Sequence, residues 1–199
     1  LALTNGHYIV QSSEWDNGLV TDVGAATWGN GNGGTVGPVS STNSLVGSTS
    51  NDRVGSKTPA LLNNGNYVIC SPLWDNGGAT NAGAATWANG NSGIVGPVSA
   101  ANSLVGTTTG DEVGDDGVHA LANGNYIVRS STWDNGPIVN AGAVTWGSGT
   151  VGVRGPVSAV NSMVGATNSD FIGAIGVTVL TNGNYIVRSP EWDNGGIVD

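Results

Sequence analysis

Residues 126–146 read YIVRSSTWDNGPIVNAGAVTW, and this stretch decides the fold because it returns along the chain at a fixed interval. Its Trp-Asp-Asn-Gly motif begins at Trp15, Trp74, Trp133 and Trp192, a constant step of 59 residues. A constant period without insertions is the sequence signature of a repeat array. The sequence therefore predicts one array with complete units at residues 1–59, 60–118 and 119–177 and a partial unit at residues 178–199.

Other residue types keep the same step. They are Tyr8, Tyr67, Tyr126 and Tyr185, then Trp28, Trp87 and Trp146, and the pairs Gly37-Pro38, Gly96-Pro97 and Gly155-Pro156. The tyrosines and these tryptophans stand beside small or β-branched residues, which favours a packing role.

Each unit predicts about four short strands. In the third unit, residues 118–121 and 126–130 form a hairpin around Asn123-Gly124, a pair expected to make a two-residue turn because both residues accept positive φ. Residues 141–146 give a third strand, whose small residues predict close packing against a neighbouring sheet. Residues 153–158 give a fourth strand, and proline places it at an edge.

No stretch shows the 3.6-residue periodicity of a helix, so the fold class is all-β. Four short strands in 59 residues are typical of a propeller blade, and the sequence predicts a β-propeller-like array. A β-prism, sandwich or β-solenoid-like array is the alternative.

Composition excludes several functions. The 199 residues carry five Lys plus Arg and a net charge of −9, which disfavours binding to nucleic acid or to anionic membranes. No apolar run approaches the ~20 residues of a membrane span. Because the chain begins at Leu1 without Met, we expect it to be a segment of a longer protein. Its one cysteine, Cys70, takes a position held elsewhere by glutamine or arginine, so we expect an incidental thiol.

The recurring Trp-Asp pairs are the candidate binding residues. A tryptophan ring can stack on a sugar while the neighbouring carboxylate accepts its hydroxyls, which predicts one shallow carbohydrate site per repeat. The alternative, favoured here, is that the ring covers one end of a sheet and Asp-Asn-Gly makes a turn. The candidates are Trp15, Asp16, Trp74, Asp75, Trp133, Asp134, Trp192 and Asp193.

Catalytic chemistry has little to build on, and we expect no enzyme activity and no cofactor. His7 and His119 occupy different repeat positions, and no Ser-His-Asp or Cys-His set recurs. Asp52, Asp111 and Asp170 precede a Val-Gly or Ile-Gly step and are expected to form turns. The cluster of Asp111, Glu112, Asp115 and Asp116 occurs in one unit alone and predicts a solvated acidic loop.

The unit resembles the FG-GAP repeat of integrin-α-type β-propellers. Phe171-Ile172-Gly173 lies where that family has Phe-Gly, residues 182–190 (NGNYIVRSP) correspond to its loop, strand and Gly-Ala-Pro, and residues 81–87 (NAGAATW) to its small-residue strand. The resemblance implies propeller blades. It does not extend to the family's calcium loops, because the corresponding turns at residues 4–7, 63–66, 122–125 and 181–184 contain no carboxylate. No metal site is therefore expected.

The spacing and the turns also resemble tandem repeats of large bacterial surface proteins of the filamentous-haemagglutinin type. This resemblance implies a scaffold or adhesin at the cell surface or in the extracellular space, with a glycan or surface protein as partner. Three units of about four strands and a partial unit of about two give about fourteen strands per chain. Two chains would then have about 28 strands, enough for a seven-bladed ring, so a homodimer that completes a propeller is a further expectation.

Overall fold

The computed structural model describes residues 1–194 and 197, and these residues form strands and turns but no helix. The first unit contains β1 (Tyr8–Ser12), β2 (Ala25–Gly29) and β3 (Leu45–Val46). The second contains β4 (Ala60–Leu61), β5 (Tyr67–Ser71), β6 (Ala84–Ala88), β7 (Gly96–Pro97) and β8 (Leu104–Val105). The third contains β9 (Val118–Ala120), β10 (Tyr126–Ser130), β11 (Ala143–Gly147), β12 (Gly155–Pro156) and β13 (Ser162–Val164), and β14 (Gly176–Val179) and β15 (Tyr185–Arg188) follow. The expected all-β repeat array is confirmed.

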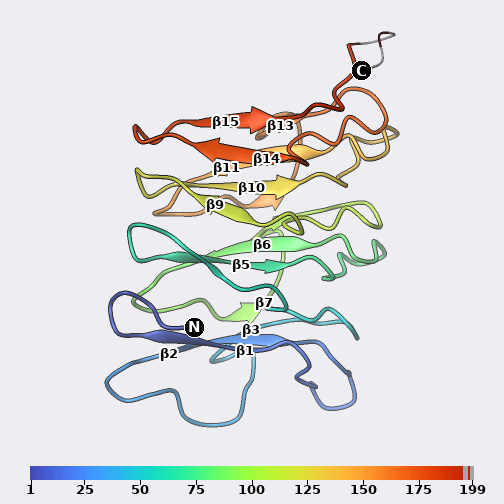
Figure 1. Ribbon diagram of the computed structural model, residues 1–199. Coiled ribbons are helices and arrows are strands. Elements are labelled where there is room, and N and C mark those ends of the chain that lie inside the picture. Colours follow the sequence, from blue (N-terminus) through green and yellow to red (C-terminus); the bar gives the residue numbers. More distant parts are fainter. Residues whose placement is uncertain (195–196, 198–199) are drawn as a thin grey trace.

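The units are stacked in a row, each adding one layer (Figure 1). The N-terminus lies at the first layer, and the chain leaves the last layer at the opposite end of the stack. Within the described part of the chain the layers do not close into a ring, so the structure does not show a propeller. Association of two chains stays a prediction.

Each layer is one small sheet, and neighbouring units share strands. The central hairpin of a unit pairs antiparallel, as in Tyr126 with Gly147 and Ser130 with Ala143. The Gly-Pro strand joins the sheet of the preceding unit, where β7 pairs parallel with β3 and β12 with β8. Proline therefore stands at a sheet edge, as predicted, but at the edge of the neighbouring layer.

The core lies between the layers because both faces of an inner strand are buried. On β5, Tyr67 and Ile69 pack toward the first unit, while Val68 and Cys70 pack toward the third. Side chains alternate between the faces of a strand, so one strand contributes to two successive cores. A third core between the last two layers contains Leu121, Ile127 and Val144, with Tyr185 and Val187 packed against it.

The Asn-Gly turns differ from the expected two-residue type. Gly124 has φ of +85°, and the glycines of the other Asn-Gly turns have φ of +85° or +86°. Asn123 does not have positive φ. The Gly124 N–H donates to Leu121 O at 3.0 Å, and the Leu121 N–H donates to Asn125 O at 2.8 Å. These bonds describe a type I turn followed by a left-handed glycine, a three-residue hairpin loop. The Asn123 carboxamide oxygen accepts from the Asn125 N–H and so holds the turn.

The small-residue strand packs as closely as its composition predicts. Gly142 has φ of +74°, and a Cβ there would lie 2.3 Å from the main-chain nitrogen of Ile172. Ala143 is fully buried in the core shared with the second unit. Side chains larger than these would separate adjacent backbones.

Candidate functional site

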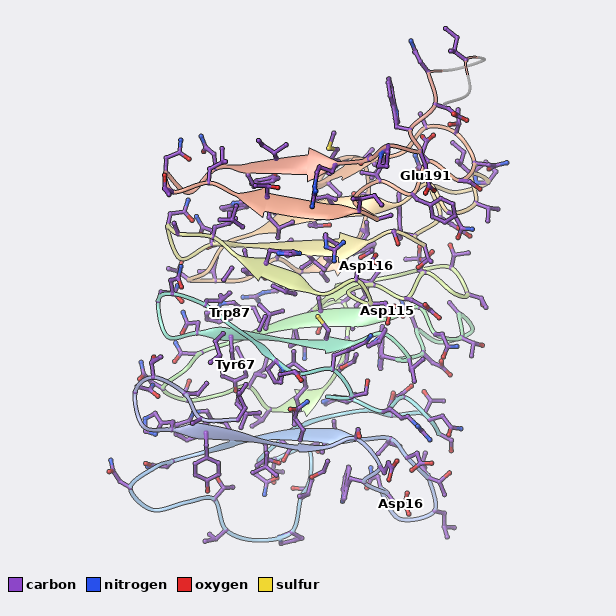
Figure 2. The ribbon with its side chains drawn as sticks, viewed as in Figure 1. Asp16, Tyr67, Trp87, Asp115, Asp116 and Glu191 are labelled. Carbon is purple, nitrogen blue, oxygen red and sulfur yellow. The ribbon has the colours of Figure 1, made fainter. Side chains whose placement is uncertain are left out.

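The Trp-Asp-Asn-Gly turns line one end of the sheets, which we call the aspartate end (Figure 2 labels Asp16 there). Trp74 and Trp133 are buried between layers, each only 4% exposed. Trp15 of the first layer is half-buried, and Trp192 of the last layer is 50% exposed. In the inner layers a sugar therefore has no access to the ring face, and the geometry supports the packing role.

The aspartate of each motif holds its own turn. The Asp75 carboxylate accepts from the Asn81 N–H at 2.8 Å, and Asn81 has φ of +50°. Asp134 accepts from the Asn140 N–H in the same way, and Asp16 accepts from the Asp22 N–H. A side-chain acceptor at this position stabilises a left-handed residue that the backbone otherwise disfavours.

A second row of aspartates, at positions 52, 111 and 170, joins the layers. Asp111 accepts from the N–H groups of Thr107 and Thr108 at 2.8 Å through one oxygen. Its other oxygen accepts from the Asp134 N–H of the next unit at 3.0 Å. Asp52 and Asp170 make the same bonds to Asp75 and Asp193. These residues form turns as expected, and they also bind the following layer.

Burial changes the pKa of these carboxyls. It raises the pKa of Asp52 and Asp111 above the ordinary value, against the opposing effect of the main-chain N–H donors. For Asp170, burial also raises the pKa, but hydrogen bonds from Thr167 and the main chain together outweigh it and leave the pKa low. All three carboxyls have their oxygens occupied by the protein, which leaves them little capacity to bind a ligand.

The opposite end of the sheets carries the Asn-Gly turns and the tryptophans at positions 28, 87 and 146, and we call it the asparagine end. Trp87 lies there in Figure 2. Its indole N–H donates to Gly149 O of the next unit at 3.0 Å, and the Asn64 and Asn66 carboxamides donate to the same oxygen at 2.7 Å. Trp28 repeats this bond to Gly90 O. Trp28 and Trp87 therefore pack as predicted and also join layers.

In the first layer His7 stands at the position of Asn66 and Asn125 and accepts the equivalent hydrogen bond. Its Nδ1 accepts from the Gly31 N–H at 3.1 Å, where Asn66 and Asn125 use a carboxamide oxygen toward Gly90 and Gly149. Its ring also lies 4.8 Å from that of Trp28. These contacts give His7 a structural role in the first layer.

Substituting Trp87 with phenylalanine is expected to lower the free energy of unfolding by about 1 kcal/mol, because one hydrogen bond between layers is lost while two amide donors to Gly149 O remain. Trp146→Phe is the matched control. Trp146 is 45% exposed, and its indole N–H has no bond among the described residues. We expect a change within about 0.5 kcal/mol for the control. Urea unfolding measures both, and equal losses would contradict this role of Trp87.

The acidic residues 111–116 separate into different roles. Asp111 is buried, Asp115 pairs with Lys57 at 2.9 Å, and Asp116 accepts from the Ser131 N–H. The expectation of a wholly solvated loop is therefore wrong, because most of its carboxylates bind the rest of the fold.

Cys70 lies in a row of side chains that otherwise cap a loop. Gln11 donates to Gly55 O and Lys57 O, and Arg129 donates to Gly173 O. Cys70 is buried instead, and burial raises the pKa of its thiol to about 12. A thiol with so high a pKa is a poor nucleophile at neutral pH, in line with an incidental role.

One polar network that recurs in every complete unit was not predicted from the sequence. Thr86 and Ser103 share a hydrogen bond of 2.7 Å, and Ser103 donates to Asn102, which in turn donates to Pro97 O. The first and third units contain the same network. The sequence signal for it is a threonine before tryptophan and, 17 residues later, a serine after asparagine.

Among the described residues, no group of three or more His, Cys, Asp or Glu side chains lies close enough together to bind a metal ion. In the same part of the chain, no helix has the length and apolar character required to cross a membrane.

Comparison with known proteins identifies the repeat. No curated protein matches the chain. A family model described as "Repeat of unknown function (DUF5650)" matches residues 2–56, 61–115, 120–174 and 179–199, at the same step of 59 residues. This match supports the repeat and gives no support to an FG-GAP identity. The chain, stacked through its buried tryptophans and aspartates, belongs to the family of the Repeat of unknown function (DUF5650).

Proposed function

We propose that the chain is a non-catalytic scaffold, an extended spacer within a cell-surface or secreted protein. One observation carries the proposal: the side chains best suited to bind a ligand instead bind the next layer. Asp111 reaches Asp134, Trp87 reaches Gly149, and Trp133 fills the core between two units. Because each unit is bonded to the next, we expect the stack to be stiff and to hold its two ends at a fixed separation.

Interactions between neighbouring units are the physical basis of a rigid array. Each inner layer is held by an apolar core, by hydrogen bonds at both ends of the sheets, and by a strand added to the previous sheet. In such arrays stability is a sum of unit and interface contributions, and length grows with the number of units. A spacer needs these two properties.

The test lengthens the array. A second copy of residues 60–118 is inserted after residue 118, and a third copy after that. We expect the maximum dimension in small-angle X-ray scattering to grow by equal steps, because each copy presents the two faces of an inner layer. A dimension that stays constant, as in a closed or collapsed particle, would contradict the scaffold.

Binding measurements separate the scaffold from the adhesin and the lectin. The same series is tested against glycan and surface-protein arrays. A signal that grows with each inserted unit would favour one site per repeat, whereas a scaffold gives none. The surface or secreted location is tested by fractionating cells that produce the parent protein.

A further inference from the structure

A small pocket lies between the second and third units, beside the tryptophan of the asparagine end. Its volume is about 140 Å³, and its lining is Trp87, Ile94, Asn102, Val151, Gly152 and Arg154. Clefts that hold drug-sized ligands have roughly 300–1,000 Å³. This pocket therefore suits a single ring-sized group.

Two walls of the pocket are held in place by hydrogen bonds within the protein. The Trp87 indole N–H donates to Gly149 O at 3.0 Å, which fixes the orientation of a ring that is partly exposed. The Asn102 carboxamide donates to Pro97 O at 2.9 Å and accepts from the Ser103 hydroxyl at 2.8 Å. A ligand meets a preorganised aromatic side chain and a preorganised amide, which lowers the entropic cost of binding.

Arg154 brings a positive charge to the rim of the pocket. Its side chain is exposed, and its guanidinium donates to Val151 O at 3.3 Å. Both ion pairs found among the described residues use other cations, so no described carboxylate neutralises Arg154. Figure 2 shows Trp87 at the asparagine end, whereas the acidic residues that it labels lie toward the aspartate end. The rim is therefore locally positive on a chain whose net charge is −9.

The same place between the first and second units lacks this combination. One step of 59 residues earlier, the lining positions hold Trp28, Thr35, Asn43, Ser92, Gly93 and Val95. The aromatic ring and the amide are kept there, but the cation and two of the apolar side chains are not. Ser92 and Val95 are exposed although the third unit stacks on the second, so the outward position of this loop belongs to the repeat itself.

We propose that this pocket binds one acidic sugar, a pyranose ring that carries a carboxylate. The C–H face of the sugar packs against Trp87, Ile94 and Val151, because an aromatic ring and aliphatic side chains favour such apolar contact. The carboxylate accepts two N–H groups of Arg154, whose planar guanidinium matches a carboxylate in a bidentate pair. The Trp-Asp pairs of the aspartate end take no part in this site. The inference goes beyond the scaffold, since it adds one recognition site at a single junction and does not depend on the stiffness of the stack.

The two halves of the pocket together select the ligand. A neutral sugar packs on the apolar wall but leaves Arg154 without an anion. A small carboxylate such as acetate pairs with Arg154 but leaves the apolar wall uncovered. The overall negative charge repels anions in general, so an acidic sugar gains affinity only where both contacts are made.

The test titrates the full chain, labelled with nitrogen-15, with methyl glucuronide and follows the indole N–H of Trp87 and the side-chain N–H groups of Arg154 by NMR. We expect saturable shifts of both, with a Kd in the millimolar range that suits one ring-sized ligand. Methyl glucoside and acetate are expected to bind at least about tenfold more weakly, because each lacks one of the two contacts.

Arg154→Val tests the cation without disturbing the fold, because valine is the residue of the second unit at this position, Val95. It is expected to weaken methyl glucuronide at least about tenfold, to the level of methyl glucoside. Adding Val160→Arg to this variant restores the net charge at a side chain that is 98% exposed and does not line the pocket, and should not restore binding. Both variants should melt like the parent chain.

A gain of binding is expected at the other junction. Thr35→Ile, Ser92→Val and Val95→Arg together place the missing side chains beside Trp28, and all three positions are exposed. The number of glucuronide sites per chain should rise from one to two.

The site is overturned by absence of a saturable shift, by equal binding of methyl glucoside or acetate, or by glucuronide binding that Arg154→Val leaves unchanged. A triple variant that stays at one site would contradict the assignment of the contacts to these side chains. The scaffold is judged separately by the length series. Inserted copies of residues 60–118 bring neither Val151 nor Arg154, so the glucuronide signal stays at one site while the array lengthens. A chain that lengthens yet ignores the sugar defeats this inference alone.

Discussion

Replacing Asp111 with alanine is expected to lower the free energy of unfolding by roughly 4 kcal/mol, a large fraction of the stability of a typical domain. The carboxylate is fully buried and accepts three main-chain N–H groups, from Thr107, Thr108 and Asp134. Each buried donor without an acceptor costs about 1–3 kcal/mol. Because one donor belongs to the next unit, the interface between the second and third layers should loosen first.

Chemical denaturation measures the loss, and hydrogen exchange at Thr107, Thr108 and Asp134 locates it. Asp134→Ala serves as the control, because that carboxylate holds a single N–H, from Asn140, and should cost about 1 kcal/mol. Asp111→Asn keeps one acceptor oxygen and should fall between the two. A loss for Asp111→Ala no greater than that of the control would show that the buried carboxylate does not join the layers.

The second large effect is expected for Gly83→Ala, about 4 kcal/mol or more, with failure to fold as the extreme. Gly83 has φ of +75°, and a Cβ would lie 2.2 Å from the Val113 nitrogen and 2.6 Å from the Glu112 carbonyl carbon. Both neighbours are backbone and cannot rotate away. The parallel bridge between Gly83 and Val113 would have to open.

Two glycines of the same unit serve as controls that distinguish the cost of positive φ from the cost of the close backbone contact. Gly77 has φ of +62° with free space around it, so alanine there should cost about 1–2 kcal/mol from backbone conformation alone. Gly78 has neither positive φ nor a close neighbour, and alanine should change stability by less than about 0.5 kcal/mol. Melting curves of the three variants give the comparison. If Gly83→Ala melts like Gly77→Ala, the close approach of the two backbones is wrong.

The position of most strands follows directly from local sequence. Tyr126–Ser130 is aromatic and β-branched, and it forms a strand because such side chains fit a pleated surface buried on both faces. The small residues before Trp146 mark the strand that packs closest to its neighbours. Asn123-Gly124 marks the turn, although the turn type depends on the hydrogen bonds around Leu121, which the pair alone does not determine.

The partners of these strands could not be derived, because a periodic sequence makes neighbours indistinguishable. Gly155-Pro156 looks equally suited to pair with Ser162–Val164 of its own unit or with Leu104–Val105 of the previous one. The same ambiguity hid the bond from Asp111 to Asp134. Whether layers follow a line or a closed circle depends on a small rotation per unit, which single residues do not encode.

The sharing of strands between layers has a consequence for folding kinetics. The Gly-Pro segments of the second and third units are alike, so each can join the wrong sheet while the chain folds, and repeat proteins are prone to such misassembly. The units do differ at single positions, such as the row of Gln11, Cys70 and Arg129. Cys70 lies beside Gly114 and Arg129 lies beside the equivalent Gly173, each within its own unit, so this row does not distinguish one neighbouring layer from another. The same strand sharing that joins the folded layers is therefore expected to slow refolding, because mispaired Gly-Pro segments must separate before the correct sheets form.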